Sequence, residues 1–98
     1  MKPDAIIEIR LKTTDEGGRE KPISILDQPF GCPLFVAGEA FDCRFLIENQ
    51  RLELGSTYEI PIKFLCPKSA IQRLSVGTPF TLWEGKDIAT GKVIRLGG

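Results

Sequence analysis

The three cysteines carry the strongest nucleophilic and metal-binding chemistry in this chain of 98 residues: they are Cys32, Cys43 and Cys66. No two of them have the C-x-x-C spacing of a zinc site or a redox-active pair, and the sequence contains no histidine. A cysteine nucleophile would therefore lack the imidazole base that activates it in Cys-His enzymes. We expect three buried, free thiols that pack as small apolar side chains, with no metal ion and no cofactor.

Carboxylates offer the other common chemistry of catalytic sites. Asp15 and Glu16 are neighbours in the chain and are followed by Gly17 and Gly18. Adjacent carboxylates on a glycine-containing turn are typical of a solvated loop, because neither is placed opposite the other across a cleft. The sequence therefore predicts that the protein is not an enzyme.

The segments that must position these residues have the period of β-strands. Apolar residues alternate with polar ones in residues 5–13, where Ala5, Ile7, Ile9 and Leu11 share one side. The same alternation recurs in residues 41–47 and 58–64, which favours half-buried strands. Pro61 lies inside the last of these runs, so we expect that strand at a sheet edge or its proline facing away from a neighbour.

The remaining segments are short and are separated by turns. Two further strands are predicted at residues 80–84 and 88–96, joined by a hairpin loop at residues 85–87, with a bulge or bend at Gly91. Residues 69–74 could form only one helical turn. Short strands with frequent glycine and proline turns indicate a single all-β domain over residues 1–98, an antiparallel barrel of about six or seven strands, closed or nearly closed.

The charge balance limits the choice of partner. Thirteen basic and thirteen acidic residues give a formal net charge of zero, without the excess of positive charge that marks nucleic-acid binding. No apolar run approaches the length of about 20 residues that a membrane-spanning helix needs. We expect a cytoplasmic protein with no membrane contact.

Several short motifs follow one another in the order found in a known domain. They are Thr13 to Ile23 (TTDEGGREKPI), Leu54 to Ile60 (LGSTYEI), Phe64 to Ala70 (FLCPKSA), Gly77 to Gly85 (GTPFTLWEG) and Ala89 to Ile94 (ATGKVI). Together they span most of the chain, and the chain resembles the C-terminal β-barrel, or third domain, of translation elongation factor Tu. The resemblance implies that barrel fold, here as a stand-alone domain.

Two departures change what the resemblance implies about function. The chain has no phosphate-binding loop of the G-x-x-x-x-G-K-[ST] type, so GTP binding is not expected. Around Pro29 the family carries an arginine that helps to grip the tRNA, and Gln28 stands in its place. Delivery of tRNA in the manner of the family is therefore not expected, although Glu84 and Gly85 match a loop that lies near the tRNA in that family.

Three regions are candidates for contact with a partner. The turn at residues 16–19 is a contact site or a simple hairpin; Trp83 is an exposed anchor or a core side chain; and residues 30–36 form an apolar run that is buried on both faces or exposed. The candidate residues are Glu16, Gly17, Gly18, Arg19, Phe30, Leu34, Phe35, Trp83, Glu84 and Gly85.

The function that these observations favour is that of a binding module that acts through protein-protein contact. The partner is another protein or a second copy of the chain. The alternative is an accessory protein of translation that binds RNA or tRNA.

Overall fold

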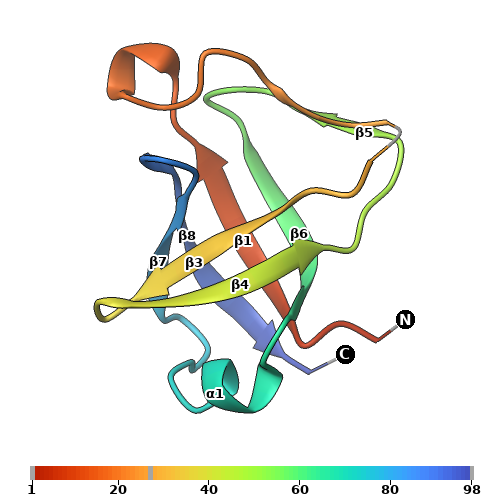
Figure 1. Cartoon of the computed structure of the whole chain (residues 1–98), viewed down its shortest axis with the longest axis vertical. Coiled ribbons are helices and arrows are strands. Elements are labelled where there is room, and N and C mark those ends of the chain that lie inside the picture. The colour runs from red at the N-terminus through yellow and green to blue at the C-terminus, as the bar shows by residue number, and fades with distance from the viewer. Residues whose placement is uncertain (1, 27, 98) are drawn as a thin grey trace.

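The structure of the chain, a computed structural model, describes residues 2–26 and 28–97. Six strands close into a barrel in the order β1-β6-β4-β3-β7-β8, and every neighbouring pair is antiparallel (Figure 1). The predicted all-β class and the closed barrel are confirmed. The barrel strands are β1 (Ala5–Leu11), β3 (Gly31–Val36), β4 (Glu39–Phe45), β6 (Thr57–Phe64), β7 (Pro79–Trp83) and β8 (Asp87–Leu96).

Four shorter elements lie outside the barrel wall. They are the 3-10 turn η1 (Thr14–Glu16), the strands β2 (Ile23–Ile25) and β5 (Gln50–Leu52), which pair with each other, and the helix α1 (Pro67–Ile71). The turn η1 and the β2–β5 pair lie near one end of the barrel, and α1 lies at the other (Figure 1). The helical turn expected at residues 69–74 begins earlier, because Pro67 occupies the first turn, where a missing N–H costs no hydrogen bond.

The barrel interior is filled by the alternating side chains predicted from the sequence. In β1 the side chains of Ala5, Ile7, Ile9 and Leu11 are fully buried, and the residues between them are half-buried. In β4 and β6 the inward face carries Phe45, Ile60, Ile62 and Phe64, all of them buried. Burial of aliphatic and aromatic side chains of this size stabilises the fold by about 1.5–3 kcal/mol each.

The apolar run at residues 30–36 also alternates, which the sequence did not reveal because nearly all of its residues are apolar. Cys32, Leu34 and Val36 of β3 are buried in the barrel, whereas Pro33 and Phe35 are half-buried on the outer side. The run is therefore neither buried on both faces nor wholly exposed. It contributes one row of side chains to the core and one to the outer surface.

Pro61 lies on β6, which is not an edge strand, because the barrel is closed. The pairing of β4 with β6 covers only residues 43–45 and ends at the Phe45 and Ile62 pair. The carbonyl of Pro61 then accepts a hydrogen bond of 2.8 Å from the N–H of Leu46, immediately beyond the end of β4. The proline is accommodated because it occupies the place where the two strands separate.

Gly91 marks a close approach of two strands and not a bulge. The register of β8 does shift, but at other places. Its pairing with β1 shifts between Ile6 and Ile7, and its pairing with β7 shifts between Leu82 and Trp83. A Cβ atom at position 91 would lie 2.3 Å from the carbonyl oxygen of Glu8 and 2.7 Å from the Phe80 ring. The predicted bulge at this position is wrong, and the reason for glycine is the missing side chain.

No helix in the described part of the chain is long and apolar enough to cross a membrane.

Candidate protein-binding surface

The loop that contains η1 is ordered by its own hydrogen bonds. Thr13 and Glu16 form a reciprocal cap. The Thr13 N–H donates to Glu16 Oε1 at 2.8 Å, and the Glu16 N–H donates to the Thr13 hydroxyl oxygen. Arg10 Nη1 donates to the same oxygen at 2.9 Å. The backbone hydrogen bond from Thr13, followed by the one from Arg10, lowers the pKa of Glu16 to about 2. The Glu16 carboxylate is therefore a structural acceptor in this loop.

The two glycines of the loop have different reasons to be glycine. Gly17 has a φ of +88°, which residues with a side chain rarely adopt. Gly18 is buried, and a Cβ atom there would lie 2.5 Å from the carbonyl oxygen of Lys12. Positive φ therefore accounts for glycine at position 17, whereas Gly18 permits close packing of the loop on the end of β1.

Arg19 joins this loop to the far end of the sequence. Its Nη1 atom forms an ion pair with Glu84, which lies in the β7–β8 hairpin, and its guanidinium stands 5.8 Å from the centroid of the Phe30 ring. Its Nε donates to the carbonyl of Lys21 at 3.0 Å. Three candidate residues from separate segments, Arg19, Phe30 and Glu84, are thus brought together.

Trp83 lies on the outer side of the barrel. Its exposed fraction is 41%, whereas Phe80 and Leu82 on the same strand are buried. The Phe35 ring of the neighbouring strand packs edge-on against the Trp83 ring, with 6.1 Å between their centroids. Of the two predicted positions for Trp83, the outer one is found.

We call two neighbouring groups of side chains together the aromatic-ionic patch: Phe35 with Trp83, and Arg19 with Phe30 and Glu84. Contacts join Phe35 to Trp83, and Glu84 to Arg19 and through it to Phe30, while Trp83 and Glu84 are adjacent in the chain. Two other candidates lie apart from it. Leu34 is fully buried inside the barrel and offers nothing to a partner, and Gly85 shapes the hairpin turn with a φ of +75°.

Two of the thiols lie opposite each other inside the barrel. Cys32 of β3 and Cys43 of β4 are register partners, and Cys43 Sγ donates to the Cys32 carbonyl at 3.3 Å. A side-chain hydrogen bond between the Cys32 thiol and Cys43, followed by burial, raises the pKa of Cys32, which disfavours its thiolate. Both are free and buried as expected, but Cys66 is exposed, so the prediction of burial was wrong for that residue.

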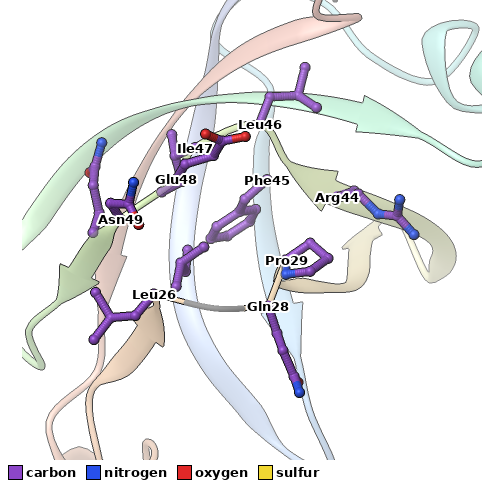
Figure 2. A pocket seen from close by; sticks show the side chains of 11 residues that line it. Leu26, Gln28, Pro29, Arg44, Phe45, Leu46, Ile47, Glu48 and Asn49 are labelled. Atoms are coloured by element: carbon purple, nitrogen blue, oxygen red, sulfur yellow. The ribbon is translucent and has the colours of Figure 1, made fainter.

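Two hollows that the sequence did not reveal lie near the end of β4, and the first reaches the buried side chains of Ile25 and Phe45. The first, of about 820 Å³, has Phe45 between the segment of Leu26, Gln28 and Pro29 and the segment of Ile47, Glu48 and Asn49 (Figure 2). The second, of about 760 Å³, extends over the outer side of β3, β4 and β6. Among the residues described, no group of three or more cysteine or carboxylate side chains is placed to hold a metal ion.

Comparison of the sequence with known proteins finds no match: no protein-family model matches the chain, and no curated protein matches it significantly.

Proposed function

We propose that this domain is a protein-binding module and that the aromatic-ionic patch is its contact surface. The observation that carries the proposal is the outward position of Trp83 with the Phe35 ring against it. Tryptophan buries a large area at a low cost in conformational entropy, and such side chains dominate the energetics of many interfaces. The ion pair of Arg19 and Glu84 gives the patch a polar margin, as interfaces commonly have.

The relationship to the C-terminal barrel of elongation factor Tu is part of this proposal. The motifs of the sequence and the antiparallel six-strand closure support it. Within that relationship a protein partner is favoured over tRNA. The guanidinium of Arg19 is already engaged by Glu84, so it is not free to pair with a phosphate group.

The experiment compares the wild type with Trp83→Ala and with a control, Val76→Ala. Val76 is an exposed apolar side chain outside the patch, so its truncation removes a similar kind of surface. We expect proteins that co-purify with the wild type and with Val76→Ala to be lost with Trp83→Ala. Since Trp83 is the sole tryptophan, its fluorescence should also shift when a purified partner is added.

Circular dichroism and thermal melting must show that the variants fold. A set of co-purified proteins that is the same for all three forms would contradict the proposal. If the partner is a second copy of the chain, sedimentation will show an association that Trp83→Ala weakens by about 2 kcal/mol or more, the value typical of an interface anchor.

A further inference from the structure

Two positive side chains lie directly opposite each other on the outer surface of the barrel. Arg44 of β4 and Lys63 of β6 are register partners, and both point away from the core. Like charges in directly opposed positions destabilise a sheet unless a negative group lies near them. Lys63 Nζ is 3.6 Å from Asp4 Oδ1, but Arg44 forms no ion pair with any residue in the ranges 2–26 and 28–97.

The guanidinium of Arg44 is also left uncovered from the other side. Its register partner on β3 is Gly31, which has no side chain to lie over it. A Cβ atom at Gly31 would stand 2.8 Å from the carbonyl oxygen of Cys43, so close packing of β3 on β4 favours glycine there. The planar donor group of Arg44 therefore faces solvent at the place where the two hollows meet.

Apolar side chains lie on both sides of Arg44, and on one side they flank the exposed carboxylate residue Asp42. On one side lie Pro33 and Leu65, the latter with an exposed fraction of 77%. On the other side lie Pro29 and Leu46, which Figure 2 shows in the first hollow. Together with Arg44 they also line the second hollow. The two hollows thus form one groove with a cationic middle and apolar surfaces on either side, which we call the Arg44 groove.

The groove is not positively charged as a whole. Arg44 and Lys63 are matched by Asp42, which lines the second hollow, and Glu48, which lines the first, and Asp4 forms an ion pair with Lys63. This balance disfavours a phosphate backbone, which would bring a negative charge to every repeat along the groove. It suits a ligand with one negative group at Arg44 and uncharged, apolar groups on both sides.

We propose that the Arg44 groove binds an extended peptide segment of another protein in which one aspartate or glutamate is flanked by apolar side chains. The carboxylate would accept two parallel hydrogen bonds from the guanidinium of Arg44, because the planar group of arginine matches the two oxygens of a carboxylate. The apolar neighbours would cover Leu65 and Pro33 on one side and Leu46 and Pro29 on the other. The groove shares none of these residues with the aromatic-ionic patch, although Phe30 of the patch lies between Pro29 and Gly31 of the groove. The inference does not depend on the role of Trp83.

The test is a selection with phage-displayed random 12-residue peptides on the immobilised, folded protein. We expect the enriched peptides to share an acidic residue between apolar ones. In fluorescence polarisation, a labelled peptide from this set should bind about tenfold or more weakly to Arg44→Gln, since a hydrogen bond between charged groups is lost. Replacing its acidic residue by the amide should weaken binding to a similar extent.

Matched controls keep the result specific. Lys68→Gln removes an exposed cation on α1, away from the groove, and should leave the affinity unchanged. Lys63→Gln is a second groove variant that should also weaken binding. It takes the place of Arg44→Gln if that variant does not fold. Chemical shifts of Gly31 and Arg44 in the NMR spectrum should move when the peptide is added.

Three outcomes would overturn the inference. The first is a selection that enriches no acidic-apolar motif, and the second is a peptide whose affinity both groove variants leave intact. The third is single-stranded RNA that displaces the peptide and binds with a steep salt dependence, which would make the groove a phosphate site. Loss of peptide binding in Trp83→Ala alone would instead place the peptide on the aromatic-ionic patch.

Discussion

Arg19 and Glu84, 65 positions apart in the sequence, form an ion pair that ties the η1 loop to the β7–β8 hairpin. The Arg19 side chain has an exposed fraction of only 23%, since it also packs over the Phe30 ring. The patch therefore joins two segments that lie far apart in the sequence. Its shape is held by tertiary structure and not by any one loop.

We predict that Glu84→Gln lowers the free energy of unfolding by less than about 1 kcal/mol, as is usual for ion pairs near the surface. Urea denaturation would measure this. A double-mutant cycle with Arg19→Met isolates the pair, because Met keeps much of the apolar stem over Phe30. A loss above about 2 kcal/mol for Glu84→Gln would mean that the hairpin and the loop do not hold their positions without this charge.

Phe45 offers the strongest test of the barrel interior. Its side chain is almost fully buried, and its ring lies 5.1 Å from that of Phe30. Phe45→Ala should destabilise the protein by about 3–5 kcal/mol, because it removes apolar contacts and leaves a cavity. Phe41→Ala, at a half-buried position of the same strand, should show a clearly smaller loss in the same denaturant titration. A loss below about 1 kcal/mol for Phe45→Ala would contradict the orientation of β4.

The orientation of side chains could be predicted in strands with one polar face, because the polarity of each residue indicates which side of the sheet it occupies. The alternation in β1 and β6 placed Ile7 and Ile60 correctly in the core. In β3 this signal is missing, since both of its faces carry apolar residues, and Leu34 and Phe35 could not be assigned to opposite sides from the sequence. For Trp83, the sequence left both sides open, and only the closure of the barrel assigns the outer one.

The contacts between strands could not be predicted, because they depend on register. The alternation already placed Arg44 and Lys63 on the outer faces of their strands, but nothing in the sequence makes them opposite neighbours. The same is true of Arg19 and Glu84, and of the approach of β1 and β8 that excludes a side chain at Gly91. These relationships are created when the barrel closes.

Glu16 makes the η1 loop sensitive to acid. Its pKa is lowered to about 2 from an ordinary value of 4.5, chiefly by the hydrogen bond from the Thr13 N–H. A carboxyl group with a lower pKa in the folded state stabilises the fold above the pKa of the unfolded state, here about pH 4.5. This contribution is lost as the pH falls from about 4.5 towards about 2.

An NMR titration of the Glu16 carboxyl group should therefore give a midpoint near pH 2. The wild type should be more stable than Glu16→Gln at pH 6, and the difference should shrink at pH 3 and below, because a protonated carboxyl resembles the amide. Asp15→Asn, a neighbouring exposed carboxyl, serves as the control. A Glu16 midpoint near its ordinary value would show that the reciprocal cap does not form in solution.

The two-residue turn between β3 and β4 contains a position that can be improved. Ala37 and Gly38 have φ values of +50° and +80°, so both central residues are in the left-handed region, as in type I′ hairpin turns. Glycine adopts this conformation freely, but alanine does so at a cost, whereas asparagine is several-fold enriched there. Ala37→Asn, which creates the preferred Asn-Gly pair, should stabilise the protein by up to about 1 kcal/mol.

Thermal melting would show the gain from Ala37→Asn as a rise of several degrees in Tm for a domain of this size. The reverse control is Gly38→Ala, which places a second strained residue in the turn and should lower the Tm. The added methyl group of Gly38→Ala would not clash with a neighbour, because no atom lies within 4 Å of a Cβ atom built at Gly38. Any loss of stability would therefore come from the backbone conformation. If Ala37→Asn lowered the Tm while Gly38→Ala raised it, the turn would have to adopt a different geometry, and the register of β3 on β4 that places Gly31 opposite Arg44 would be in question.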